Sequence, residues 1–344
     1  MKRIQTLGIG LAASLSFATS AVQAQDVYTL SMSSMLPAVT THHRMVLEPW
    51  AAMLKEESGG RLEVEIFPGA SLCKPTEQYD CVEAGLADIA YGVPGWSPNR
   101  FPRTSVVELP FLFKSAETGS RILAELWDDY ISADYGDVQV LTMNVHPSGQ
   151  INTSKVPVRT IEDLQGLSIR TPTAVTGDVM DLLGATKVGM PSNEVYQAMS
   201  QGTIDGFVVN YEGIVSFKLE EVTQYHTEVS MYSTVFALWM NKDSLSGLPE
   251  DLQALILEST APGSGYWSEI AALWDGNDQN ARQALVDLGH EIITLEDDEM
   301  ARWRDATNPI YETWIADMEA AGVSDAADIV AAARAVVEDA GETQ

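Results

Sequence analysis

Residues 160–174 read TIEDLQGLSIRTPTA, and this stretch decides the fold class. A polar turn leads into a short apolar strand at residues 167–169, and Arg170 follows it. Pro172 ends the strand because proline has no N–H for a sheet hydrogen bond. A helix is expected to begin near Thr173 or Ala174. A short apolar strand that passes directly into a helix is typical of α/β folds.

Arg170 is a candidate carboxylate-binding residue. Ligands of open α/β sheets bind at the carboxyl ends of strands. The guanidinium offers five N–H donors in fixed geometry, and a helix N-terminus also favours anions. A positive group aimed at the interior is unusual in a chain with a formal net charge of −29. Two interpretations stay open: a carboxylate clamp, or a structural arginine paired with one of the many acids.

The first 24 residues have the features of a signal peptide. Lys2 and Arg3 precede an uncharged run at residues 4–18, and Ala-Val-Gln-Ala at 21–24 resembles a cleavage site. Gln25 is expected to begin the mature chain. The run is too short and too rich in Ser and Gly for a membrane anchor. We therefore expect a soluble, exported protein.

Composition indicates two domains and excludes some partners. Without residues 1–24, the 344-residue chain keeps 320 residues, which is more than one ordinary core. Removing Lys2 and Arg3 changes the net charge from −29 to −31. So acidic a surface argues against nucleic acid or an anionic membrane as partner.

Cys73 and Cys81 lie eight residues apart in an exported chain, so a disulfide is favoured over two free thiols. It would fix a loop to the following helix and contribute about 2–3 kcal/mol. No histidine is near in sequence, so a metal site is disfavoured, and we expect neither a metal nor a cofactor.

Strands and helices alternate through the first half, which predicts a mainly parallel sheet with helices on both faces. Strands are expected at residues 27–32, 61–67, 88–92 and 138–143, an extended apolar segment at 106–113, and helices at 43–57, 75–84 and 115–130.

The second half continues this pattern and adds segments that cross between domains. Strands are expected at residues 150–153, 167–170, 186–189 and 204–209, a crossing strand at 228–240, and helices at 193–201, 263–288 and 295–321, the last broken at Pro309. Trp267, Trp274, Trp303 and Trp314 lie in helical stretches and are expected in the core. We expect domain I at 25–147 plus about 236–275, domain II at 148–235 plus about 276–330, and a tail at 331–344.

Five pieces in this order and spacing resemble the DctP-type solute-binding protein of tripartite ATP-independent periplasmic (TRAP) transporters. They are YTLSM (28–32) with EESGGRLEVEIFP (56–68), VEAGLADI (82–89), FP (101–102) with LPFLF (109–113), QGLSIRTP (165–172), and MP (190–191) with EVYQAM (194–199) and GTIDG (202–206). The pieces lie between residues 28 and 206, and the resemblance as a whole covers nearly the whole mature chain.

The resemblance implies a type II-like periplasmic binding protein: two α/β domains, crossing strands and a long domain-spanning helix. Such a protein captures a small organic acid in the periplasm and delivers it to the membrane subunits of an ion-gradient-driven permease. It also implies that Arg170 is the carboxylate-binding arginine. We expect a monomer.

Other contacts follow the family pattern less closely. Many relatives carry a second arginine before the strand at 150–153, but residues 146–153 read HPSGQINT. His146 and Gln150 are expected to supply neutral hydrogen bonds there. Asn210 and Tyr211 are pocket candidates, with capping of the next helix as the alternative for Asn210.

Aromatic residues are candidates for the pocket wall. Trp96 lies in a loop rich in Gly and Pro, and Trp239 ends the crossing strand. Packing at the domain edge is the alternative for Trp96. His42 and His43 follow the loop after the first strand, and His43 is a candidate ligand contact beside the expected cleft. A structural position at the helix start and a weak metal site are the alternatives for this pair.

The missing second arginine and the added aromatic residues favour a monocarboxylate with an apolar or aromatic body. An enzyme is disfavoured because the chain has no nucleophile-elbow, HExxH or phosphate-loop motif. An exported sensor that presents a bound acid to a membrane receptor stays as an alternative.

Overall fold

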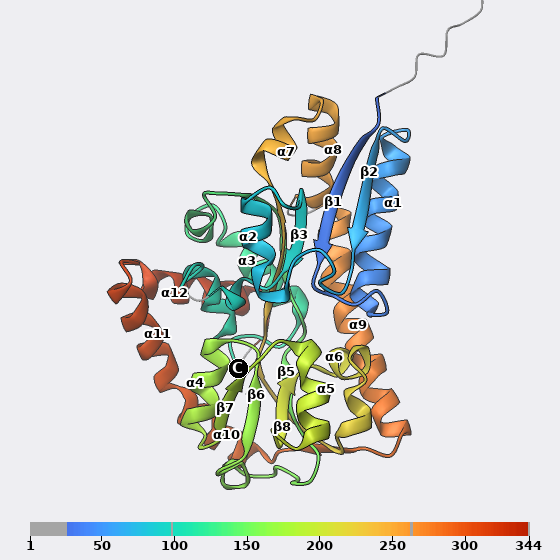
Figure 1. The fold of residues 1–344 in the computed structure, drawn as a ribbon. Coiled ribbons are helices and arrows are strands. Elements are labelled where there is room, and N and C mark those ends of the chain that lie inside the picture. Colours follow the sequence, from blue (N-terminus) through green and yellow to red (C-terminus); the bar gives the residue numbers. More distant parts are fainter. Residues whose placement is uncertain (1–25, 98, 262–263, 343–344) are drawn as a thin grey trace, which may run out of the picture.

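The computed structural model describes residues 26–97, 99–261 and 264–342, without the side chains of residues 265–268. The expected signal peptide lies outside the described residues. Two sheets lie one above the other in Figure 1, with helices packed around each. The α/β class expected from the sequence is confirmed. We propose that each sheet is the core of one domain.

The first sheet has the strand order β2-β1-β3-β10-β4. Its strands are β1 (Tyr28–Ser34), β2 (Leu62–Phe67), β3 (Ile89–Gly92), β4 (Gln139–Val145) and β10 (Val235–Met240). Its helices are α1 (Glu48–Glu57), α2 (Gln78–Glu83), α3 (Ala116–Glu125), α7 (Lys242–Ser246) and α8 (Glu250–Thr260). β1 pairs in parallel with β2 and β3, whereas β10 is antiparallel to both of its neighbours.

The second sheet has the order β11-β9-β5-β8-β6-β7. Its strands are β5 (Gly149–Thr153), β6 (Ser168–Thr171), β7 (Thr186–Gly189), β8 (Gly206–Val209), β9 (Tyr225–Tyr232) and β11 (Glu291–Thr294). Its helices are α4 (Ala174–Leu182), α5 (Ser192–Gln201), α6 (Tyr211–Ser216) and α10 (Asp297–Thr307). β5 is antiparallel to β8 and β9.

The chain crosses between the sheets at residues 146–148 and 233–234. The single strand expected at 228–240 is therefore two strands, β9 in the second sheet and β10 in the first. Strands β5 and β10 each begin directly after a crossing, and both are antiparallel to their neighbours. Both sheets are therefore mixed and not mainly parallel as expected. Helix α9 (Gly265–Asp287) contacts α3 beside the first sheet and α6 beside the second. Figure 1 shows it running past both sheets.

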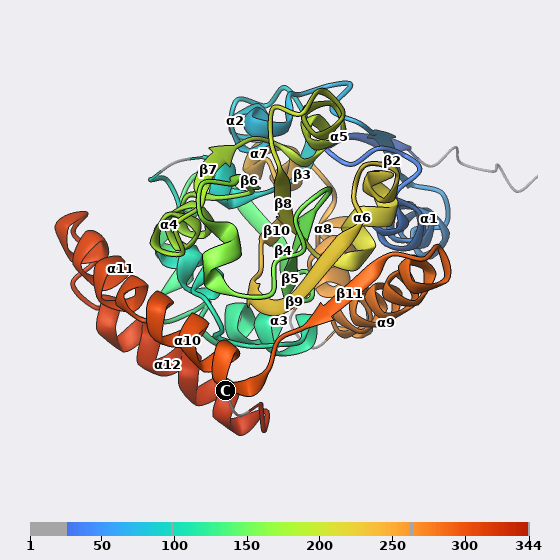
Figure 2. The ribbon, with the colours of Figure 1, turned by 90° about the horizontal axis from the view of Figure 1, so that it is seen from below.

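The C-terminal helices wrap one side of the molecule (Figure 2). Pro309 begins α11 (Pro309–Ala320) directly after α10, which confirms the expected break. Residues assigned to a tail instead belong to α12 (Ala326–Asp339), which packs on α3 of the first sheet. Its apolar residues Ala333, Val336 and Val337 are buried, and this burial keeps the end of the chain helical.

The segment at 106–113 is not extended, because residues Arg103–Glu108 form a 3-10 helix. Val106 and Val107 are buried in the main hydrophobic core, where this 3-10 helix packs against β10. Their β-branched side chains favoured a strand, but core packing decides the local conformation.

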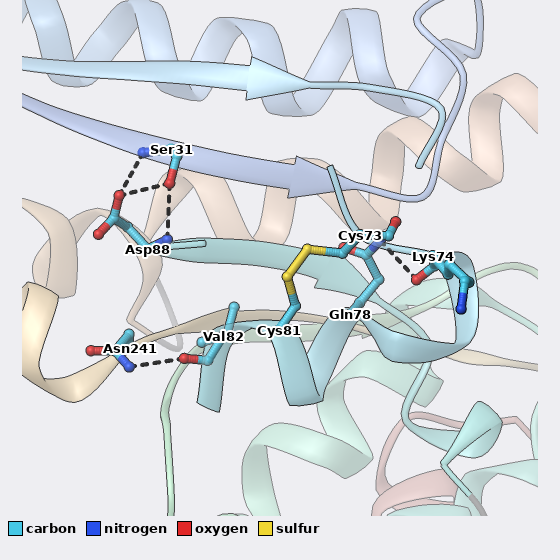
Figure 3. Close-up of a disulfide and its surroundings, with 8 residues drawn as sticks. All are labelled: Ser31, Cys73, Lys74, Gln78, Cys81, Val82, Asp88 and Asn241. Atoms are coloured by element: carbon cyan, nitrogen blue, oxygen red, sulfur yellow. Dashed lines mark hydrogen bonds between the residues drawn. A yellow bond between two sulfur atoms is a disulfide. The ribbon is translucent and has the colours of Figure 1, made fainter. Parts of the chain in front are cut away.

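A disulfide joins Cys73 to Cys81, as expected, with the two Cα atoms 6.4 Å apart. Figure 3 shows it linking the loop before α2 to that helix, where Gln78 Nε2 also donates to the Cys73 carbonyl oxygen at 2.7 Å. Both contacts hold the loop that follows β2.

Candidate ligand-binding site

A cavity lined by residues of both halves of the fold lies between the two sheets. Its walls come from the segments that follow β1, β3, β6 and β8, from both crossing links and from α9. These segments gather at the carboxyl ends of parallel strands, where α/β proteins bind ligands.

Arg170 is held at the end of β6 with its side chain directed into this cavity, and the residue is 1% exposed. Its Nε–H donates to the Met190 carbonyl at 2.8 Å, Nη1 to the Val208 carbonyl at 3.3 Å, and Nη2 to Ser192 Oγ at 3.2 Å. These bonds use three of five N–H groups, so one N–H on each terminal nitrogen stays available. Two such donors match the two oxygens of one carboxylate.

Arg170 forms no ion pair with an acidic side chain in the described part of the chain. Burial lowers the pKa of its guanidinium to about 10, so the group is still a cation at neutral pH. A buried charge is costly unless an opposite charge and hydrogen bonds compensate it. The electrostatics of the cavity therefore favour a bound anion.

Five rings form a continuous wall beside Arg170: His146, Tyr232, Phe236, Trp274 and His42. The ring centroids of His146 and Tyr232 are 5.3 Å apart, those of Phe236 and Trp274 4.9 Å, and those of Trp274 and His42 4.4 Å. Burial lowers the pKa of His146 to about 4 and that of His42 to about 3, so both are neutral at pH 7. An uncharged aromatic wall suits an apolar or aromatic ligand body.

Asn210 reaches the cavity at the start of α6, where α9 holds it. Its Nδ2 donates to Asp278 Oδ1 at 2.8 Å, and the same oxygen accepts from the Glu212 N–H at 2.8 Å. Burial raises the pKa of Asp278 to about 7 and also raises that of Glu212. This buried cluster couples α9 to the second sheet beside the ligand space.

Contacts between the two halves cover the cavity. Trp96 Nε1 donates to the Pro172 carbonyl at 3.0 Å. Glu108 is buried and hydrogen-bonds Thr173. Gly95 lies between the side chains of Thr173 and Glu108. A Cβ at this position would lie 2.8 Å from Thr173 Cγ2 and 2.9 Å from Glu108 Oε1, so there is room only for glycine. The structure is therefore in a conformation with the halves closed on one another.

Four of the eight residues predicted to bind ligand line the cavity: Arg170, Asn210, Trp96 and His146. Their contact with a ligand stays a prediction. The alternative of a side-chain cap for Asn210 is not observed, because its amide bonds Asp278 and not the first turn of α6.

The side chains of Gln150 and Tyr211 lie elsewhere. Gln150 Oε1 accepts from the Val229 N–H at 2.8 Å, so this amide secures the irregular pairing of β5 and β9. The Tyr211 hydroxyl donates to Glu228 Oε1 at 3.1 Å. Both polar groups already have protein partners away from the cavity.

His43 and Trp239 also lie outside the cavity wall. His43 Nε2 is 3.3 Å from Glu48 Oε1, whereas the adjacent His42 lines the cavity. Consecutive residues of a helix point in different directions, and the sequence could not choose between them. Trp239 is packed in the core, with its ring edge-on to Tyr79 at 5.4 Å.

Trp274 is buried in a small core cluster as expected, but nothing in the sequence indicated its place on the cavity wall. It is 4% exposed, as a core residue would be, but it also lines the cavity. Trp303 and Trp314 are buried as expected, and the side chain of Trp267 lies outside the described residues. Tyr232 and Phe236 gave no separate signal, because apolar residues recur along the crossing strand from Val229 to Met240.

The family model described as bacterial extracellular solute-binding protein, family 7 (DctP), matches residues 32–317. The chain belongs to this family. A TRAP solute-binding protein from Rhodoferax ferrireducens, solved with copurified benzoate, is 30% identical, with a TM-score of 0.87 over 92% of this chain and 99% of that one. A marine-metagenome TRAP solute-binding protein, solved with 3-hydroxybenzoate, is 33% identical, with a TM-score of 0.87 and the same coverage.

The C4-dicarboxylate-binding periplasmic protein DctP of Rhodobacter capsulatus is 25% identical over 265 residues, which is 76% of this chain and 78% of that protein. The motif resemblance to TRAP solute-binding proteins is thus confirmed. This DctP-family protein is a TRAP solute receptor for small organic acids that works with membrane permease subunits, and it is not an enzyme.

Proposed function

We propose that this receptor captures an aromatic monocarboxylate in the periplasm and delivers it to its TRAP permease. The carboxylate binds the two remaining N–H groups of Arg170, and the ring of the ligand lies against the aromatic wall. The contact between Trp96 and Pro172 keeps the halves closed over it.

The main observation in support of the proposal is that the described part of the cavity wall has one positively charged side chain, Arg170. Among the described residues that line it, Arg170 is accompanied by no lysine and no second arginine. A second ligand carboxylate would enter beside Glu212 without a cation to pair with, which is costly in a buried site. The pocket therefore favours one carboxylate on an uncharged body.

Two relatives support the ligand class. The proteins solved with benzoate and with 3-hydroxybenzoate are 30% and 33% identical to this chain. Both molecules carry one carboxylate on an aromatic ring, which is the combination that we propose for the cavity of this chain.

A thermal-shift screen tests the proposal. Benzoate, phenylacetate, succinate and glucuronate are added separately to the mature protein, and hits are measured by calorimetry. A ligand at 100 times its Kd stabilises the folded state by about 2.7 kcal/mol, which such a screen detects. We expect the aromatic acids to bind, whereas tighter binding of succinate or glucuronate would overturn the assignment.

A further inference from the structure

Three buried polar atoms of the cavity wall have no hydrogen-bond partner among the described residues: His42 Nε2, Thr234 Oγ1 and Trp274 Nε1. Each residue is at most 5% exposed. Buried polar groups in folded proteins are nearly always paired, and an unpaired one weakens the folded state. A carboxylate on Arg170 does not account for atoms on the aromatic wall.

Two of these atoms belong to neighbouring rings, His42 and Trp274, which follow His146 along the wall. Arg170 contributes to the lowered pKa of His146. Ring contacts continue from His146 to Trp274, with centroids 6.3 Å apart, and from Trp274 to His42 at 4.4 Å. A ligand held by Arg170 and lying along this wall presents its far end to His42 and Trp274.

The chemistry of these atoms restricts what they can bind. The indole N–H of Trp274 is only a donor, so its partner must accept a hydrogen bond. His42 is neutral at pH 7, so its Nε2 can either donate or accept. A carboxylate has no cation to pair with here, and an ammonium group cannot accept from the indole. A hydroxyl group can accept from Trp274 and donate to His42.

We propose that the solute is a hydroxylated aromatic monocarboxylate whose ring hydroxyl, at the end away from the carboxylate, hydrogen-bonds Trp274 Nε1 and His42 Nε2. Thr234 Oγ1 offers a third partner in the link between β9 and β10. This inference rests on the proposed function and specifies its ligand. Sites built to pair a hydroxyl discriminate against the analogue that lacks it, because their own polar atoms then stay unpaired.

The test measures by calorimetry how tightly the wild type and its variants bind benzoic acids that differ only in a ring hydroxyl. Benzoate, 3-hydroxybenzoate and 4-hydroxybenzoate are titrated into the wild type, Trp274→Phe and His42→Phe. Both variants keep an aromatic ring and remove its nitrogen. Trp239→Phe is the control, because Trp239 Nε1 is also buried and unpaired but lies outside the cavity.

We expect the wild type and Trp239→Phe to bind one hydroxybenzoate at least about tenfold more tightly than benzoate. Trp274→Phe and His42→Phe should lose most of this preference, measured within each variant as the ratio of its hydroxybenzoate and benzoate affinities. Equal binding of the three acids by the wild type would overturn the inference and leave the proposed function standing. A preference that persists in both variants would also overturn it, whereas no binding of any aromatic acid would refute the proposed function itself.

Discussion

Glu108 should make the stability of this receptor fall as the pH rises. Burial at the contact with Thr173 raises the pKa of this carboxyl from 4.5 to about 8. The folded state therefore keeps a proton that the unfolded chain releases above about pH 4.5. Each tenfold difference in proton affinity corresponds to about 1.36 kcal/mol, so the full effect is about 5 kcal/mol between pH 4.5 and pH 8.

Glu108→Gln replaces the titrating carboxyl with an amide that can still hydrogen-bond Thr173. Urea unfolding at pH 4.5, 6 and 8 measures the free energy of unfolding of both proteins. The variant should gain stability relative to the wild type as the pH rises, by about 3–5 kcal/mol over this range. Glu56→Gln, at an exposed carboxyl, controls for the loss of one negative charge. A constant difference between Glu108→Gln and the wild type would refute the argument.

Two further predictions concern the cross-link and the closed conformation. Protein from an oxidising compartment should show no free thiol when it is unfolded without reductant. Reduction of the Cys73–Cys81 bond should lower the free energy of unfolding by about 2–3 kcal/mol. Two titratable thiols would contradict the bond. Trp96→Phe removes the hydrogen bond to the Pro172 carbonyl, so ligand affinity should fall by about 2- to 10-fold. With benzoate, small-angle scattering should show less compaction of this variant than of the wild type. Unchanged affinity and compaction would show that this bond does not stabilise closure.

Short sequence patterns were enough to predict the position of Arg170 at the end of a strand and most of the helices and strands. A short strand, an arginine and a proline define the end of β6, and Pro309 marks the start of α11 because proline disrupts a continuous helix. The Cys73–Cys81 pair could also be proposed from spacing and compartment. These features depend on residues close together in the chain.

The aromatic wall could not be predicted in this way. Trp274 comes from α9, His42 from the segment after β1, and Phe236 from β10, so their contact depends on how distant segments pack. Burial alone does not distinguish a core ring from a cavity ring. Trp239 was therefore expected in the pocket wall although it packs in the core, and the place of Trp274 on the cavity wall was not predicted. Residues 331–339 were assigned to a tail because only tertiary packing on α3 shows that α12 is secured.

The binding of an aromatic monocarboxylate by wild type, Arg170→Ala and Arg170→Lys tests the central claim most directly. Calorimetry with benzoate and 3-hydroxybenzoate should show a loss of about 2–5 kcal/mol in Arg170→Ala, because the carboxylate would be left unpaired in a buried site. Arg170→Lys should also bind poorly, since an ammonium cannot replace the planar pair of N–H donors. Arg159→Ala, at an exposed ion pair with Glu291, should bind normally. Near wild-type affinity in either folded Arg170 variant would contradict the account.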